Sequence, residues 1–243
     1  MGFLRMNTQR IILTEGGKGG GGKTTFAASL IDYLRSNNIP LTLLDCDIEN
    51  KKSGSLSHLF KGTPKLDITT PRGLDQFVDL AFNEEASTVV ADLGAGSGQW
   101  TFNWFDAMYE PAAEAGCRFL CIGVVTAESA TVDTALHWAE TLRDRVDYLI
   151  VCNQRNGRDF SDLSTTRFRK FLDATHAPII NMEARVESIQ QDLDRAGLSL
   201  AAYLDAAAES LPPSLKQWST RIRIRGYLNR INKQLESIID RLR

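Results

Sequence analysis

The chain has 243 residues, of which 43% are hydrophobic and 24% are charged, and its formal net charge is −2. This size and balance suit one globular domain with a sizeable core, which we expect to span residues 1–243. No apolar stretch is long enough to cross a bilayer, and the start, 1–6, is too short for a signal peptide. The four cysteines lack C-x-x-C spacing, which excludes that type of metal site and favours buried thiols in a cytoplasmic protein.

Apolar, β-branched runs alternate with helical patterns along the chain. This alternation predicts an α/β fold, in which a doubly wound, mostly parallel sheet lies between two layers of helices. In such sheets ligands bind at the carboxyl ends of the strands. The expected strands are 10–14, 41–45, 66–69, 88–92, 118–126, 147–152 and 177–181, and the expected helices lie near 24–36, 73–83, 101–115, 129–144 and 161–174.

The composition changes at Leu211-Pro212-Pro213. We therefore expect the core of the domain to cover about 9–210 and a C-terminal amphipathic helical segment to cover about 213–243.

A glycine-rich segment, Glu15-Gly-Gly-Lys-Gly-Gly-Gly-Gly-Lys-Thr-Thr25, separates the first expected strand from the first expected helix. Gly17, Gly22, Lys23 and Thr24 satisfy G-x-x-x-x-G-K-[ST], the phosphate-binding loop of P-loop NTPases. Glycines let backbone N–H groups point inward, and the helix N-terminus adds its positive dipole end. We expect Lys23 to reach the β- and γ-phosphates, Thr24 to ligate Mg²⁺ and Thr25 to bond the α-phosphate.

The segment Lys18-Gly19-Gly20-Gly21-Gly22-Lys23-Thr24 also matches K-G-G-x-G-K-[ST]. In this it resembles the ParA/MinD family of deviant Walker A ATPases, which belongs to the SIMIBI class of P-loop proteins. The resemblance implies a homodimer that forms with ATP and Mg²⁺ and is dissolved by slow hydrolysis to ADP. It also implies that Lys18 of one subunit reaches the phosphates bound by the other. Under this resemblance the nucleotide is bound by Gly19, Gly20, Gly21, Gly22, Lys23, Thr24 and Thr25.

Three acids close two of the expected strands. Asp45 and Asp47 lie on one side of their strand by alternation, and the resemblance implies that Asp47 orients the attacking water while Asp45 supports the magnesium site. Asp92 ends the strand 88–92, where P-loop NTPases carry a second magnesium residue, usually acting through a water. The sequence departs from the family in two places: Gly94 replaces a proline, and 48–52 replaces the D-P-Q-G-N switch segment of many partition ATPases.

Asn153 follows the strand 147–152. The resemblance implies that it contacts adenine, whereas the alternative is a simple turn residue. The guanine signature N-K-x-D is absent here, which favours ATP over GTP.

The C-terminal segment is basic, because residues 216–243 carry eight Lys/Arg and two acids, which leaves −8 for the rest of the chain. One interpretation is a nonspecific DNA surface built from Arg221, Arg223 and Arg225. A membrane-surface helix ranks below DNA, because the segment lacks bulky aromatics after Trp218. The third interpretation is a helix that packs its apolar stripe on the domain and leaves its arginines in water.

The aromatic segment 100–105 follows the Asp92 loop, and it is either a partner surface or part of the core. The resemblance to the ParA/MinD family implies an ATPase for the partition or transfer of plasmid or mobile-element DNA, with an activating partner protein. The alternatives are the positioning of a membrane or protein cargo, and a scaffold that binds nucleotide without hydrolysing it.

Overall fold

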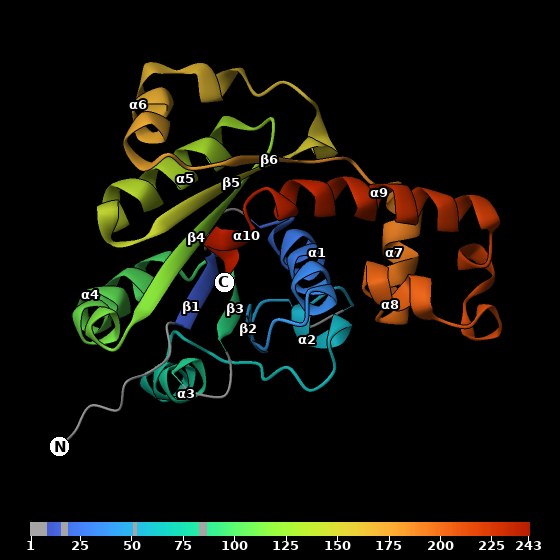
Figure 1. Ribbon diagram of the computed structural model, residues 1–243, viewed down its shortest axis with the longest axis horizontal. Coiled ribbons are helices and arrows are strands. Elements are labelled where there is room, and N and C mark those ends of the chain that lie inside the picture. Colours follow the sequence, from blue (N-terminus) through green and yellow to red (C-terminus); the bar gives the residue numbers. More distant parts are fainter. Residues whose placement is uncertain (1–8, 16–18, 51–52, 83–86) are drawn as a thin grey trace.

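The computed structural model describes residues 9–15, 19–50, 53–82 and 87–243. Within these ranges six strands form one sheet in the order β2-β3-β1-β4-β5-β6, and each pairing is parallel. This confirms the α/β class and the doubly wound sheet (Figure 1). The strands are β1 (Gln9–Thr14), β2 (Leu41–Cys46), β3 (Thr88–Leu93), β4 (Cys117–Val125), β5 (Asp147–Asn153) and β6 (Ile179–Met182).

Helices cover both faces of the sheet (Figure 1). One face packs against α3 (Pro71–Ala81), α4 (Gly98–Glu114), α5 (Ser129–Leu142) and α6 (Thr166–Thr175). The other packs against α1 (Lys23–Ser36), α2 (Leu56–Leu59), α7 (Glu187–Ala196), α8 (Leu200–Asp205), α9 (Trp218–Glu236) and α10 (Ile239–Leu242).

The central strand β1 shows why the sheet needs both layers. Ile11 and Leu13 enter one core cluster and Ile12 enters the other, because successive side chains of a strand point to opposite faces. A strand buried on both faces is typical of parallel sheets. The order of strands puts β3 beside β1 and β2 beside β3, so the carboxyl ends of these three strands meet at one edge.

The expected strand at 66–69 is wrong. Leu66 and Ile68 are buried as predicted for apolar residues, but the segment forms a turn instead of a strand. The Asp67 carboxylate accepts from the Thr69 amide at 3.1 Å and the Asp67 carbonyl accepts from the Thr70 amide at 3.1 Å. An aspartate that bonds its own following backbone competes with strand pairing.

Three helices on the sheet's second face, α2, α7 and α8, are not among the expected elements. The helix α7 is mainly polar, and its apolar contacts come chiefly from Ile189 and Leu193. This narrow apolar side gives little periodic signal in the sequence.

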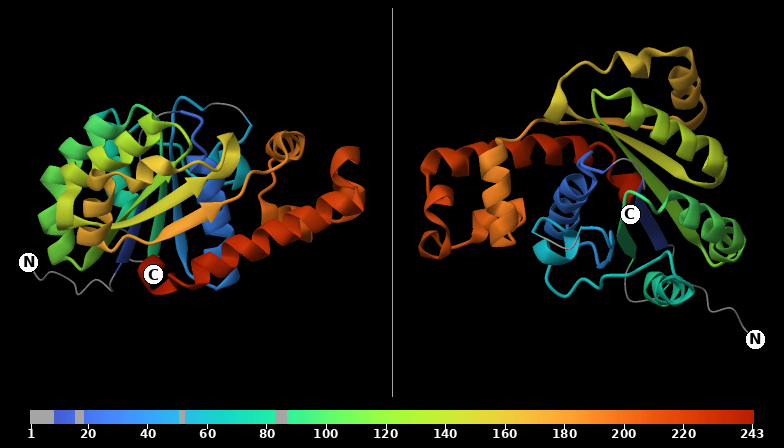
Figure 2. Two further views of the ribbon diagram at one scale, coloured as in Figure 1. Left: turned by 90° about the horizontal axis from the view of Figure 1, so that it is seen from above. Right: turned by 180° about the vertical axis from the view of Figure 1, so that it is seen from behind.

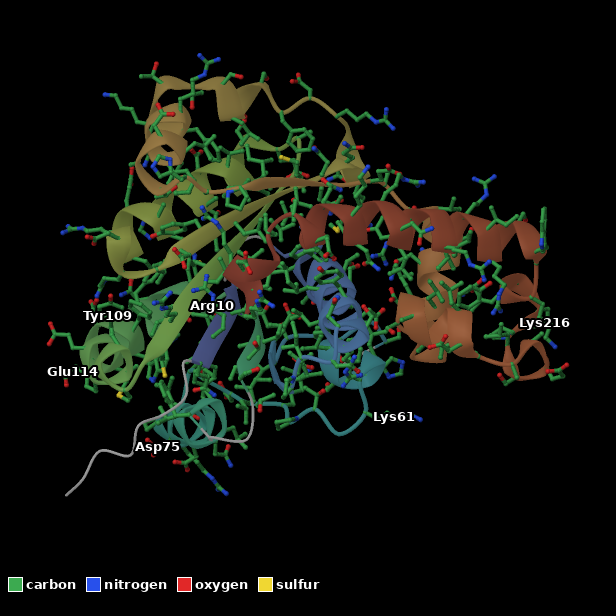
Figure 3. The ribbon with its side chains drawn as sticks, viewed as in Figure 1. Arg10, Lys61, Asp75, Tyr109, Glu114 and Lys216 are labelled. Carbon is green, nitrogen blue, oxygen red and sulfur yellow. The ribbon has the colours of Figure 1, made fainter. Side chains whose placement is uncertain are left out.

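The helix α9 is an integral part of the second core. It buries Ile224, Tyr227, Leu228, Ile231 and Leu235 against the domain. The Tyr33 hydroxyl of α1 donates to Glu236 at 2.8 Å near the end of α9. In Figure 2, α9 runs from α10 past α1 to the region of α7 and α8. Lys216, just before α9, lies at the opposite end of the molecule from Tyr109 and Glu114 (Figure 3).

The edge strand β6 is covered by one side chain of α9. The Gln234 side chain accepts from the Asn181 amide at 2.8 Å and donates to the Asn181 carbonyl at 3.0 Å. Gln234 thus takes the hydrogen-bonding position that another strand would take, which protects the edge.

The aromatic segment 100–105 lies in α4, which buries some of its rings and leaves another exposed. Phe102, Trp104 and Phe105 are buried in the first core, whereas Trp100 is 47% exposed. None of the described helices is long and apolar enough to cross a membrane.

Candidate nucleotide-binding site

The phosphate-loop segment joins β1 to α1, as the sequence predicts. Gly17 and Lys18 lie outside the described residues, whereas Gly19, Gly20, Gly21 and Gly22 belong to them. Gly22 precedes α1 with a φ of 92°, and a Cβ there would come within 2.3 Å of Asn153 Nδ2. Both the backbone angle and the close approach require glycine at this position.

Beneath the loop, Asp92 holds the first turn of α1. Its side chain is buried and accepts from the Thr24 hydroxyl at 2.6 Å. Its other oxygen accepts from the Thr14 hydroxyl at 3.0 Å, and Thr14 in turn accepts from the Leu93 amide at 2.8 Å. The contacts bring Thr24 and Asp92 together as expected, and they add Thr14, which the sequence analysis did not single out.

Burial dominates the electrostatics of this cluster. It raises the pKa of Asp92 to about 6, while the hydrogen bonds from Thr24 and Thr14 and the charge of Lys23 act in the opposite direction. Burial also lowers the pKa of Lys23, against the attraction of Asp92 and Asp47. An anionic ligand here would be stabilised by a partly desolvated cation, because charge interactions strengthen away from water.

The residues present fit a magnesium ion. The hydroxyl of Thr24 and the carboxylate of Asp92 are oxygen donors, which Mg²⁺ prefers, and they already lie within 2.6 Å of each other. Burial is the main cause of the raised pKa of Asp92, so a bound cation would relieve the cost of desolvating its carboxylate.

Asp47 lies beside the loop that follows β3. Its carboxylate accepts from the amides of Glu49 at 3.2 Å and Asn50 at 3.3 Å, which fixes its orientation. A Cβ on Gly94 would stand 3.0 Å from Asp47 Oδ1 and 3.2 Å from its Cα. Glycine in place of the family's proline therefore allows the loops after β2 and β3 to approach closely.

Asp45 is the neighbour of Asp92 across the β2–β3 pairing, but its carboxylate bonds groups of other segments. One oxygen accepts from the Asp47 amide at 3.2 Å, and the other accepts from the Ser57 amide at 3.0 Å and the Ser57 hydroxyl at 2.6 Å. Lys65 lies 3.5 Å from this second oxygen. The side chain has no exposed surface, and these contacts fit support of the segment 55–65 better than direct contact with an ion.

Asn153 lies against the glycine loop. Its Nδ2 donates to the Gly21 carbonyl at 2.9 Å, and its Oδ1 accepts from the Arg155 amide at 3.1 Å. It lines a cavity of about 500 Å³ together with Gly22 and Thr25, which is the expected side of the loop for a nucleoside. A larger cavity of about 780 Å³ includes Asp147 at the start of β5, so it lies at the amino ends of the strands.

The cavity of about 500 Å³ beside Asn153 also contains Arg185, which the sequence analysis did not single out. Its guanidinium donates to Ser29 of α1 at 2.9 Å, to Gln190 of α7 at 2.7 Å and to Tyr227 of α9 at 3.2 Å. It also stacks on the Tyr227 ring at 4.3 Å from the centroid. Arg185 therefore joins three helices at the side of the nucleotide cavity.

Glu15, directly after β1, is a buried acid beneath the loop. Burial raises the pKa of Glu15 to about 8. The hydrogen bond from the Cys121 thiol, which lies 3.8 Å from Oε1, and the charge of Lys23 act in the opposite direction. A Cβ on Gly123 would come within 2.9 Å of the carboxyl group. Gly123 thus makes room for Glu15. In the sequence, the buried position of Glu15 is indicated only by its place between an apolar strand and a glycine loop.

Comparison with known proteins agrees with this geometry. The family described as "CobQ/CobB/MinD/ParA nucleotide binding domain" matches residues 12–241. The septum site-determining protein MinD complexed with Mg-ADP, from Pyrococcus horikoshii, is 15% identical and aligns over 95% of this chain and 96% of its own, with a TM-score of 0.57. A MinC:MinD cell division complex from Aquifex aeolicus gives 17% identity, 96% of each chain and a TM-score of 0.53. No curated protein sequence matches the chain.

Replacing Lys23 tests the phosphate loop. We expect Lys23→Ala to abolish binding of a fluorescent ATP analogue, because the variant removes the cation that faces the phosphates. Lys61→Ala, which removes an exposed lysine remote from the loop, is the control and should bind normally. Tight binding by Lys23→Ala would contradict the assignment.

Replacing Glu15 tests its buried, protonated state. The folded chain retains a proton up to a pH of about 8, whereas the unfolded chain releases it near 4.5. Stability should therefore fall as pH rises through this window, since each pKa unit corresponds to about 1.4 kcal/mol.

We expect chemical denaturation at pH 5, 6, 7 and 8 to show a shallower decline for Glu15→Gln than for the unchanged chain. Glu187→Gln, at an exposed position, is the matched control. Parallel pH profiles for Glu15→Gln and the unchanged chain would mean that Glu15 is charged in the fold.

Proposed function

Because this chain belongs to the family of CobQ/CobB/MinD/ParA nucleotide-binding domains, we propose that it binds ATP with Mg²⁺ and hydrolyses it to ADP and phosphate. One observation carries the proposal: Thr24 and Asp92 meet at 2.6 Å beneath a glycine loop that continues into Lys23. The family consists of nucleotide-hydrolysing P-loop ATPases, and the MinD of Pyrococcus horikoshii was crystallised with Mg-ADP.

Each residue has a defined part in this proposal. Thr24 and Asp92 would hold Mg²⁺, directly and through a water, and the bound ion would neutralise charge on the phosphates. Lys23 would contact the β- and γ-phosphates and Thr25 the α-phosphate. Asp47, oriented by two backbone amides, would position the attacking water. Asn153 would support the glycine loop and lie beside the base.

We further propose that ATP joins two copies of the chain and that hydrolysis separates them. The support is the sequence K-G-G-G-G-K-T, in which Lys18 would reach the phosphates of the partner subunit. A second cation at a dry interface would stabilise charge that develops in the transition state. The four described cysteines are buried free thiols, which supports a cytoplasmic location.

Two variants separate dimerisation from hydrolysis. Asp47→Ala should form an ATP dimer that persists, because the water is no longer positioned, and Lys18→Ala should bind ATP yet stay monomeric. Light scattering after gel filtration gives the mass, and phosphate release gives turnover, which we expect to fall by about 10²-fold or more in both variants. Normal turnover of Asp47→Ala, or normal dimers of Lys18→Ala, would remove that residue from the mechanism.

As the output of the switch we propose partition or transfer of plasmid or mobile-element DNA. The support is the basic C-terminal segment, in which Arg223 and Arg225 are exposed. Successive helical residues are about 100° apart, so Arg221 and Arg225 share one side of α9 whereas Arg223 lies on another side. Arg221 also donates to the Leu204 carbonyl, which leaves Arg225 as the clearest candidate for a phosphate contact.

The DNA proposal predicts a charge-specific effect. Asp47→Ala protein should cosediment with random-sequence DNA in Mg·ATP but not in Mg·ADP. Adding Arg225→Glu should weaken that binding on the order of tenfold and flatten its salt dependence, whereas Lys61→Glu, which changes net charge equally, should not.

Binding to anionic liposomes instead of DNA would favour a membrane-positioning ATPase. Binding to neither, with an ATP dimer still present, would favour a protein cargo. ATP binding without any phosphate release would favour the non-hydrolysing scaffold.

A further inference from the structure

A groove of about 420 Å³ lies between α7 and α9, on the side of the nucleotide cavity that Arg185 borders. Its apolar lining comes from the loop before α7, from α7 and α8, and from α9. Two of these side chains remain strongly exposed: Val186 at 46% and Ile222 at 47%. The residues that line the groove include Val186, Ile189, Leu193, Ile222, Arg223 and Arg230.

The exposed apolar surface continues past the groove. Trp218 is 78% exposed and precedes Ile222 by four residues, so the two lie on the same side of α9. Single exposed apolar residues are common, but a contiguous set beside a concave groove is typical of a binding surface.

The charges around the groove have one dominant sign. Arg230 is paired with Glu183 at 2.7 Å, whereas Arg185 donates to Ser29, Gln190 and Tyr227 and its charge also acts on Asp194. Arg223 has no ion pair among the described residues, and α9 as a whole carries five basic residues and one acid.

The acids of α7 have partners other than Arg223 among the described residues. Glu187 lies 3.8 Å from Arg155, Asp192 is 2.9 Å from Arg195, and Asp194 accepts from Gln190 at 2.7 Å. The side of α7 that lines the groove consists of Ile189 and Leu193. An apolar floor with a cationic border is complementary to an apolar ligand that carries carboxylates.

The geometry also selects the form of the ligand. A peptide that adds a strand would need a free sheet edge, but Gln234 already bonds both backbone groups of Asn181 on β6. A furrow between two helices instead accepts the apolar side of a third helix. Most of the side chains that line the groove are apolar, whereas a duplex is bound chiefly through its phosphates by Lys and Arg.

We propose that the α7–α9 groove binds an acidic amphipathic helix of a partner protein. Apolar side chains one helical turn apart would enter between Val186 and Ile222, and flanking Asp or Glu side chains would pair with Arg223. Trp218 would cover the next turn of the bound helix. Arg225 does not line this groove, so the groove itself is separate from the proposed DNA contact.

The test uses peptides selected from a displayed library of random 18-residue sequences on the full chain. We expect selected peptides to share apolar residues at i, i+3/i+4 and i+7 with flanking Asp or Glu. In fluorescence anisotropy, Ile222→Asp and Arg223→Glu should each weaken binding of the consensus peptide on the order of tenfold. Changing the peptide's acids to lysine should restore its binding to Arg223→Glu.

Matched controls separate the groove from general effects. Ile179→Asp alters an isoleucine of similar exposure, 43%, on β6, and Lys61→Glu changes the net charge as much as Arg223→Glu at an exposed lysine outside the groove; both should bind the peptide normally. All four variants should bind ATP and unfold at the same temperature as the unchanged chain. Lys23→Ala should still bind the peptide, so failure of the ATPase proposal would be recognisable separately.

Three results would overturn the proposal. The selected peptides could lack the acidic amphipathic pattern, or they could bind equally to Ile222→Asp and Arg223→Glu. Alternatively, phosphatidylserine vesicles or a 30-base-pair duplex, and not the peptides, could bind in a manner that depends on Ile222 and Arg223. That third result would assign the surface to a membrane or to nucleic acid.

Discussion

The buried carboxylate of Asp92 is the constraint on which the site depends. A carboxylate removed from water is costly unless donors or cations surround it, and here Thr14 from β1 and Thr24 from α1 supply hydroxyl donors. These two bonds tie the ends of two neighbouring strands to the first turn of the loop helix. The position of the glycine loop above the sheet is therefore set by the solvation of one acid, as well as by apolar packing.

Close approach of backbone segments completes the site. Gly94 lets the loop after β3 approach Asp47, Gly22 lets α1 approach Asn153, and Gly123 leaves space for Glu15. In each case a polar side chain at or just after the end of another strand comes close to the space that a Cβ would occupy. Arg185 then extends the site outward, because it joins α1, α7 and α9 beside the nucleotide cavity. A ligand that displaced this guanidinium would alter contacts of all three helices.

The sequence predicted the features that depend on local order: the glycine loop between strand and helix, the acid ending β3, and the alternation that builds the sheet. It could not predict that Asp45 is engaged by Ser57 and Lys65, because those partners come from a distant segment. The segment 66–69 resembles a strand in the sequence because Leu66 and Ile68 alternate, but the hydrogen bonds of Asp67 that form the turn leave no such pattern. The spacing of Arg221, Arg223 and Arg225 in the sequence suggests one basic surface. The geometry of the helix α9 places Arg223 on a different side from Arg221 and Arg225.

Gln234 gives the fold an order of assembly. Until α9 is in place, the backbone groups of Asn181 on β6 have no Gln234 to bond, and an open parallel edge of this kind can recruit a strand from another molecule. Synthesis proceeds from the N-terminus, so β6 emerges about fifty residues before the side chain that closes it. During that interval the edge strand β6 of the nascent chain has unpaired backbone groups that can bond to another chain. Chaperone demand and inclusion-body formation should therefore be governed by how quickly the last long helix docks.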